Sequence, residues 1–183
     1  MSVPDVQAGG WRAWVDYTEA PRSSTENGPS VKVELYRFAS GTIFRALLAG
    51  RFAESRQKFE IMFERSQPQF GRGEVVASRF SKRPLYGGLP VEYEDAVKKG
   101  ASLVEDIGVE PLTGTLVIES AASHPVDSSA VAFELTAGLL AASLTRMARG
   151  TVPDKSWCDD MLLDLAVLTG AGGLRKRRSS APS

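Results

Sequence analysis

Hydrophobic and polar positions alternate with a period of two residues over much of the first half of the chain. Residues 31–37 alternate in this way, which predicts a strand with one face toward a core, and residues 58–64 repeat the pattern. Residues 73–80 are a third strand candidate, bounded by glycines. Residues 42–50 are ambiguous, because their apolar positions fit a helical stripe as well as a bent strand. An aromatic cluster within the first 30 residues is either a strand or a clasp over a sheet edge.

The period changes to that of a helix further along the chain. Residues 92–104 and 128–147 carry apolar stripes at helical spacing, and residues 113–119 between them predict a strand. Asp127 is well placed to cap the second of these helices, because its carboxylate can accept the free N–H groups of the first turn.

A last helix is expected to open at Pro153 and Asp154 and to end at the glycines of residues 170–173. One side of it is lined by the apolar residues Trp157, Met161, Leu162, Leu165 and Leu168. The order of strands, helix, strand, helix and extra helix predicts an α+β domain, with the helices packed on one face of a mixed sheet.

These patterns divide the chain into four parts. We expect an N-terminal extension over 1–30, a folded domain over 31–150, a C-terminal helix over 151–173 and a basic, disordered tail over 174–183. A length of 183 residues suits one domain with such additions. With 43% hydrophobic and 24% charged residues, the chain has enough apolar material for a core.

Charge is unevenly spread, although the formal net charge is zero. Residues 50–83 hold eight basic and four acidic residues, whereas residues 84–134 hold nine acidic and two basic ones. Residues 175–178 add four consecutive basic residues. The pattern fits a polar protein with opposite faces, or an anionic partner held by the basic segment and the tail.

Few residues suggest catalysis or a cofactor. The chain lacks the glycine-lysine loop that cradles nucleotide phosphates and the Gly-x-Ser-x-Gly nucleophile motif. His124 is the only histidine and Cys158 the only cysteine, so we expect no metal site, no disulfide and no cofactor. Neither a signal peptide nor a run of membrane-spanning length is apparent, which favours a non-enzymatic cytoplasmic protein without a membrane partner.

Two segments carry more specific information. The first begins Gly87-Gly88-Leu89-Pro90-Val91-Glu92-Tyr93 and continues with Ala96, Val97, Lys99 and Gly100. The second begins Pro111-Leu112-Thr113-Gly114 and, after a strand, reads His124-Pro125-Val126-Asp127-Ser128-Ser129, with Ala132 and Phe133 following. Together they resemble domain IV of elongation factor G, whose pattern has Gly-Gly-x-Ile-Pro-x-Glu-Tyr, Ala-Val-x-Lys-Gly, Pro-Leu-x-Gly and His-x-Val-Asp-Ser-Ser-x-x-Ala-Phe in this order.

The resemblance covers residues 31–150 and implies a split β-α-β sandwich of the ribosomal-protein type. In that family the domain is an arm whose tip enters the decoding region of the small ribosomal subunit. By position, one tip loop would comprise His124, Pro125, Asp127 and Ser128. The other would comprise Gly50, Arg51, Phe52, Ala53, Glu54 and Ser55, in place of the family's glycine-rich loop.

This chain also departs from the family. It carries no GTPase motif, so we expect no GTP-driven translocation. The second tip loop has lost most of its glycines, the strand before His124 is shorter, and the last helix and tail have no counterpart.

The resemblance implies a non-enzymatic module that binds ribosomal RNA near the decoding region and modulates or protects translation. A translation factor is another target. Phosphate contacts are expected from the basic residues Arg56, Lys58, Arg72, Arg175, Lys176, Arg177 and Arg178. The alternative is a subunit that interacts with other proteins or with a second copy, through Trp11, Trp14 and the stripe Trp157, Met161, Leu165 and Leu168.

Overall fold

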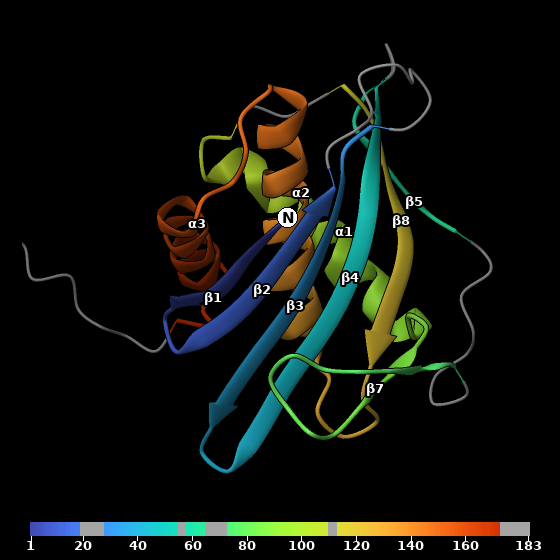
Figure 1. Ribbon diagram of the computed structural model, residues 1–183, viewed down its shortest axis with the longest axis vertical. Helices are drawn as coiled ribbons and strands as arrows, with labels where there is room; N and C mark the ends of the chain where they lie inside the picture. Colours follow the sequence, from blue (N-terminus) through green and yellow to red (C-terminus); the bar gives the residue numbers. More distant parts are fainter. Residues whose placement is uncertain (19–27, 55–57, 65–72, 110–112, 173–183) are drawn as a thin grey trace, which may run out of the picture.

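The computed structural model describes residues 1–18, 28–54, 58–64, 73–109 and 113–172. It is an α+β structure in which a curled, mainly antiparallel sheet is covered on one face by three helices (Figure 1). The strands are β1 (Ser2–Ala8), β2 (Trp11–Thr18), β3 (Ser30–Ala39), β4 (Thr42–Glu54), β5 (Glu60–Phe63), β6 (Val75–Val76), β7 (Leu85–Gly87) and β8 (Gly114–Ser123). The helices are the short η1 (Val91–Tyr93), α1 (Glu94–Asp106), α2 (Ala130–Ala148) and α3 (Lys155–Leu168).

The sheet has the order β1-β2-β3-β4-β8-β7-β6, and β5 pairs in parallel with β8. Val31, Val33 and Leu35 of β3 are buried toward the helices, which confirms the alternation predicted for this strand. The ambiguous residues 42–50 belong to the long strand β4. They are extended because β4 lies between β3 and β8, where both edges of its backbone find partners.

The N-terminal hairpin is an integral part of the sheet. The seven residues of β2 from Arg12 to Thr18 pair with β3 in unbroken antiparallel register. Trp11, Ala13 and Val15 are buried in the same core as the helices. Of the two interpretations of the N-terminal aromatic cluster, the strand is therefore correct. The sheet also includes strands that precede residue 31, where the folded domain was expected to begin.

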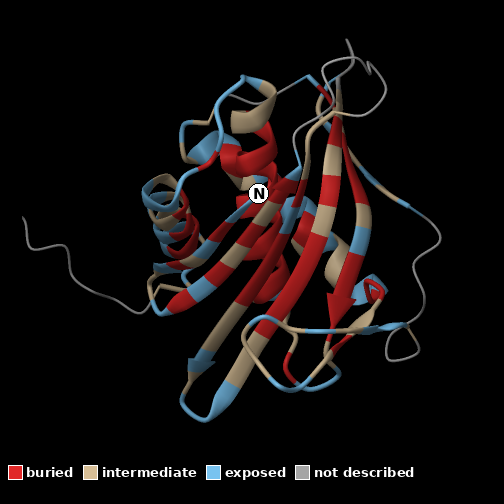
Figure 2. Cartoon of the chain, viewed as in Figure 1, coloured by how far each residue is buried: buried red, intermediate tan, exposed pale blue. Residues whose placement is uncertain are grey.

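The segment from β6 to β7 crosses the sheet face that the helices leave open (Figure 1). Only Val75 and Val76 of the predicted strand 73–80 are strand residues, because the chain turns at Ser78 to bind Glu34 on the open face. Under this segment Leu47, Leu85 and Ala122 form a small second cluster of buried residues. Figure 2 shows the central strands lined by buried residues.

Helices α1 and α2 pack closely because glycines stand where they cross. A Cβ atom at Gly100 would lie 2.0 Å from the carbonyl oxygen of Glu134. One at Gly138 would lie 3.1 Å from the carbonyl oxygen of Gly100 in α1 and 2.7 Å from a methyl group of Leu165 in α3. Lys99 Nζ lies 2.9 Å from the carboxylate of Glu134, which is almost fully buried. The helix predicted over residues 92–104 is thus confirmed as α1. Its residue Gly100 sets the distance between α1 and α2.

Helix α3 begins where the sequence predicted, and Asp154 caps it, because its carboxylate accepts the N–H of Trp157. Its stripe mostly faces inward, since Leu162 and Leu165 are fully buried, whereas Leu168 is 48% exposed. Leu165 is therefore not available to a partner. Cys158 is buried as well, and burial raises the pKa of its thiol to about 12, so the thiol stays protonated near neutral pH.

Helix α2 is long and apolar enough to cross a membrane by length and composition, which the sequence analysis did not expect of any segment. In this structure 83% of its apolar window is buried, so it is the central core helix, as in a soluble protein.

We predict that Gly100→Ala will destabilise the protein by about 1–3 kcal/mol, because the added methyl group overlaps the α2 backbone and the helices must separate. Denaturant unfolding followed by circular dichroism would measure this. Ser102→Ala, at an exposed position of the same helix, is the control and should change stability by less than about 0.5 kcal/mol. Equal stability of the two variants would show that the crossing is not tight.

Candidate functional site

The two loops assigned to one tip lie at opposite ends of the β4–β8 pair. The strands are antiparallel, with Leu47 opposite Ala122 and Glu54 opposite Gly114. His124, which follows the end of β8, therefore lies beside the start of β4. The expectation of a common tip is wrong, because antiparallel pairing places the end of one strand next to the beginning of the other.

Gly50, Arg51, Phe52 and Ala53 form no loop, because they are paired residues of β4. Gly50 is buried, and a Cβ there would lie 2.5 Å from the carbonyl oxygen of Val117. Phe52 is 4% exposed and belongs to the core, while Arg51 Nε lies 2.9 Å from a carboxylate oxygen of Glu119. These residues hold the sheet together.

Of the other expected contact residues, the structure describes only Lys58. Lys58 is exposed just before β5. Ser55, Arg56, Arg72, Arg175, Lys176, Arg177 and Arg178 lie outside the described residues.

The turn between β3 and β4 lies at the same end of the sheet as His124 and was missed by the sequence analysis. Ser40 and Gly41 both have positive φ, at 51° and 79°, as in the tight turns that close hairpins. Phe38, just before the turn, is 63% exposed. The signal was the Ser-Gly pair between two alternating segments, which was obscured by the ambiguity of residues 42–50.

The His124 loop, residues 124–128, is fastened to β4 by main-chain and hydroxyl contacts. Arg45 N–H donates to the carbonyl of Asp127 at 2.8 Å. The Ser128 hydroxyl donates to the carbonyl of Arg45 at 2.8 Å and accepts the N–H of His124 at 2.9 Å. Val126 remains 79% exposed at the outer end, with Pro125 beside it. The loop is thus preformed, and an apolar pair of residues faces solvent.

The imidazole of His124 is held inside this loop. Its side chain is 15% exposed, and Nδ1 lies 3.3 Å and 3.2 Å from the N–H groups of Val126 and Asp127. The tautomer that fits these contacts has its proton on Nε2. The 3.2 Å approach of Nδ1 to Asp127 Oδ2 is then no hydrogen bond. The Ser128 hydroxyl is already hydrogen-bonded to main-chain groups. It is therefore not available as a nucleophile that His124 could activate.

Arg45 is a fully buried cation beneath the loop. Its Nη2 donates to the carbonyl of Arg83 at 2.9 Å, and Nη1 lies 3.8 Å from Asp127 Oδ2. Its Nε and Nη1 form no hydrogen bond within the described residues. Burial lowers the pKa of Arg45, and the carboxylates of Glu34 and Asp127 act in the opposite direction. The guanidinium nevertheless stays charged, since its ordinary pKa is far above neutrality.

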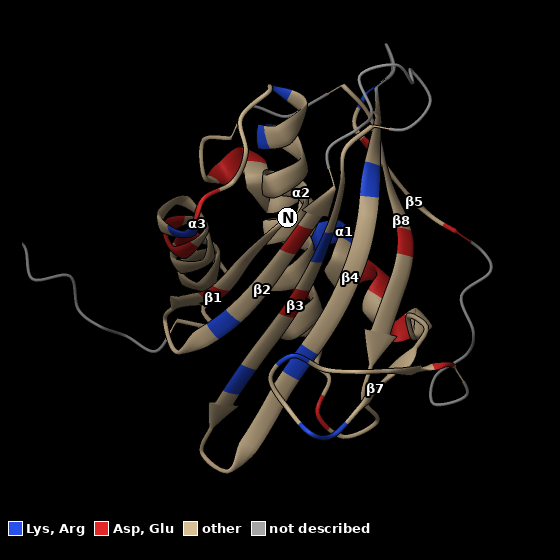
Figure 3. Cartoon of the chain, in the orientation of Figure 1, with Lys and Arg blue, Asp and Glu red and all other residues tan. Residues whose placement is uncertain are grey.

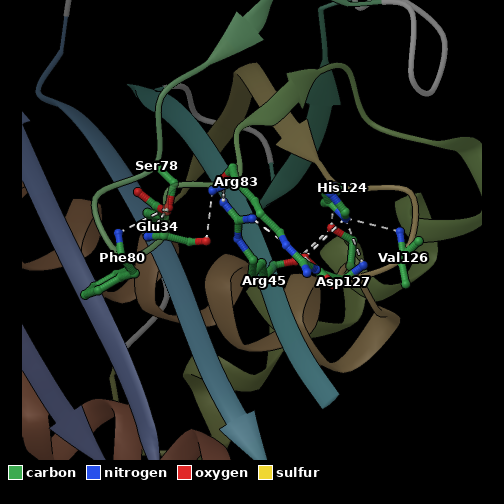
Figure 4. Close-up of polar contacts among 10 residues, drawn as sticks. Glu34, Arg45, Ser78, Phe80, Arg83, His124, Val126 and Asp127 are labelled. Carbon is green, nitrogen blue, oxygen red and sulfur yellow. Dashed lines mark hydrogen bonds and ion pairs between the residues drawn. The ribbon is translucent and has the colours of Figure 1, made fainter. Parts of the chain in front are cut away.

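Two buried carboxylates flank this cation, and Figure 4 shows Arg45 between Glu34 and Asp127. Glu34 accepts the Ser78 hydroxyl at 2.5 Å and the N–H of Arg79 at 2.8 Å. Asp127 does not cap α2 as predicted. Ser129 does, because its hydroxyl accepts the N–H of Ala132 at 3.2 Å, which leaves the Asp127 carboxylate for Arg45.

The open face also carries a hollow of about 320 Å³ between β8 and the segment of β6 and β7. Its lining includes Lys32, Glu74, Gly87, Glu119 and Ser120. No group of three or more His, Cys, Asp or Glu residues is arranged to hold a metal in the described part of the chain. The lining is mixed, with two carboxylates and one ammonium among apolar residues such as Leu47, Val76 and Ala122.

Comparisons with known proteins identify neither a family nor a named relative. No family model matches the chain, and no curated protein matches it. Among solved structures, a protein from Thermus thermophilus matches with a TM-score of 0.44 and 14% sequence identity. The match covers 78% of this chain but only 18% of the Thermus protein. A likeness at this level supports no statement about function.

We predict that Asp127→Ala will destabilise the protein by about 1–3 kcal/mol, because it leaves the buried Arg45 with Glu34 as its only flanking carboxylate among the described residues. The double variant Arg45→Met/Asp127→Ala should be less destabilised than the sum of its two single variants, by at least about 1 kcal/mol. Denaturant unfolding of all four proteins would give this coupling. Additive effects would mean that the two side chains do not act as a pair.

Proposed function

We propose that this protein is a non-enzymatic, cytoplasmic module of the elongation factor G domain IV type that binds RNA of the small ribosomal subunit. The proposal starts from the sequence resemblance. It is supported by the way the two resembling segments meet: the rings of Tyr93 and Phe133 stack at 4.8 Å, and the Tyr93 hydroxyl donates to the carbonyl of Ser128 at 3.2 Å. The first segment thus braces the end of the His124 loop.

The observation that carries the functional part is the preformed His124 loop at one end of the sheet. Its contacts to Arg45 fix its shape before any partner arrives, which lowers the entropic cost of binding. Arg83 and Lys82 are exposed on the segment next to it, and Arg83 Nη1 lies 4.0 Å from Asp127. We therefore place the proposed RNA contact at His124, Pro125, Val126, Lys82 and Arg83, and not at residues 50–55.

Figure 3 shows basic segments at the lower ends of β2, β3 and β4 and on the loop before β7. These positions surround the same end of the sheet. The cation of β4 at this end, Arg45, is fully buried, so phosphate contacts would fall to the exposed Lys82 and Arg83. Such contacts release counterions, so binding should weaken as salt rises.

We expect the purified protein to co-sediment with small ribosomal subunits at about 50 mM salt and to be released several-fold at about 200 mM. A His124→Ala/Arg83→Ala variant should lose most of this binding, because it removes an imidazole of the loop and an exposed cation beside it. Arg51→Ala, at the opposite end of β4, is the matched control and should bind as the unmodified protein does.

A thermal melt of each variant would separate lost binding from lost folding. Absence of co-sedimentation at every salt concentration, or equal loss with Arg51→Ala, would contradict the proposed contact.

A second candidate function, a subunit that binds a protein or a second copy, is favoured by exposed apolar residues on α3. Leu163, Val167 and Leu168 are 43%, 65% and 48% exposed. Trp11 and Leu165, which the sequence placed on this surface, are buried, so the contact would shift to these three residues. Apolar side chains of one helix at this exposure are common at helix-docking surfaces.

On this second hypothesis, light scattering after size exclusion should give a mass above 19.7 kDa for the unmodified protein and the monomer mass for Val167→Asp. The charge would prevent burial of α3 against another chain. A monomer in both cases, at all concentrations, would leave α3 without a role in self-association.

A further inference from the structure

Three aromatic rings and two arginines form a strip on the open face of the sheet. We define the arginine–aromatic strip as Arg12, Trp14, Tyr36, Arg79 and Phe80. Arg12 and Trp14 point to the open face from β2, opposite Tyr36 and Glu34 of β3. Arg79 and Phe80 lie over these strands because Glu34 holds the segment down through Ser78 and the N–H of Arg79.

Each arginine of the strip lies on an aromatic ring. The guanidinium of Arg12 is 5.0 Å from the centre of the Phe80 ring, and that of Arg79 is 5.0 Å from the centre of the Trp14 ring. The rings of Tyr36 and Phe80 lie 5.8 Å apart. The side chains of Arg12 and Arg79 are 47% and 58% exposed. Both planar cations therefore lie against an aromatic ring, with part of their surface open to solvent.

Neighbouring carboxylates orient these arginines. Arg12 donates to Asp5 through Nε at 3.1 Å and Nη2 at 2.8 Å. Arg79 Nη2 lies 3.8 Å from Asp16, which also accepts the indole N–H of Trp14 at 2.8 Å. These contacts are at the edges of the guanidinium groups. A planar guanidinium held at its edge can still stack on a flat ligand.

Charge around the strip favours an anionic chain along one side. Lys82 and Arg83 are exposed beyond Phe80, toward the His124 loop. Arg83 forms one long ion pair, 4.0 Å from Asp127, and Lys82 forms none within the described residues. On the other side, the hollow is lined by Glu74 and Glu119 with Lys32. Phosphate groups would be attracted to Lys82 and Arg83, whereas the lining of the hollow offers no net positive charge.

We infer that the arginine–aromatic strip binds single-stranded RNA, with bases stacked on the guanidinium planes of Arg12 and Arg79 and the sugar-phosphate chain along Lys82 and Arg83. Unpaired bases stack on aromatic rings and on arginine planes, and they tolerate any sequence because every base has a flat face. The inference rests on the proposed function for the choice of RNA. It adds the form of RNA and the surface that takes it.

The test measures fluorescence anisotropy of a labelled single-stranded RNA of about 12 nucleotides, within the usual size of such sites, at about 50 mM salt. The intact chain should bind it, and Arg12→Lys/Arg79→Lys should weaken binding by about tenfold or more, because lysine keeps the charge but loses the stacking plane. Arg146→Lys is the matched control. Arg146 also lies on an aromatic ring, 4.8 Å from the centre of Trp157, but on the helix side of the molecule. It should bind as the unmodified chain does.

The inference would be overturned by no binding of the RNA at low salt, by unchanged affinity in the double lysine variant, or by equal affinity for a duplex of the same length, whose bases are hidden. Polyglutamate that competes as well as unlabelled RNA would also overturn it, in favour of an acidic protein partner.

The oligonucleotide and ribosome experiments separate the two proposals. If the protein co-sediments with ribosomal subunits but does not bind the oligonucleotide, the strip is rejected as an RNA site and the His124 loop remains the proposed contact. If oligonucleotide binding depends on the strip but the protein does not co-sediment with ribosomal subunits, the strip is supported as an RNA site and the ribosome is rejected as the target.

Discussion

A guanidinium without contact to water joins three segments that are far apart in the sequence. Arg45 binds the carbonyl of Arg83, lies next to Asp127 of the His124 loop and faces Glu34 of β3. Burying a charge costs free energy unless opposite charges and hydrogen bonds surround it. Arg45 can therefore stay buried only if each of these segments keeps its position. The Arg45 side chain thus links the segment before β7 to the His124 loop, whose own shape is held by contacts to the Arg45 main chain.

The two faces of the sheet consequently differ in kind. The helix side is a dry core whose thickness is set where Gly100 and Gly138 allow α1, α2 and α3 to approach. The open side has a small apolar cluster under β7 and otherwise carries polar, charged and aromatic side chains, partly covered by the segment from β6 to β7. The first face provides stability, and the second is the surface on which the proposed RNA contacts lie.

The residues that carry the family resemblance have mostly structural roles in this chain. Tyr93 stacks on Phe133, Gly100 lets the helices approach, and Asp127 and Ser128 fasten the His124 loop. These residues therefore support the proposed architecture more than they support a particular binding partner. The exposed residues proposed to bind RNA, such as Lys82 and Arg83, lie outside the resembling segments. This is why the proposed fold and the proposed function need separate experiments.

The sequence by itself determined the α+β class, the strand at residues 31–37 and the helices α1, α2 and α3, because the spacing of apolar residues is a local property. It did not determine which strand ends meet. The separation of His124 from residues 50–53, the inclusion of the N-terminal hairpin in the sheet and the exchange of Asp127 for Ser129 as the cap of α2 were decided by tertiary structure. Strand pairing and buried charge partners depend on contacts between residues far apart in the chain, and no local spacing encodes them.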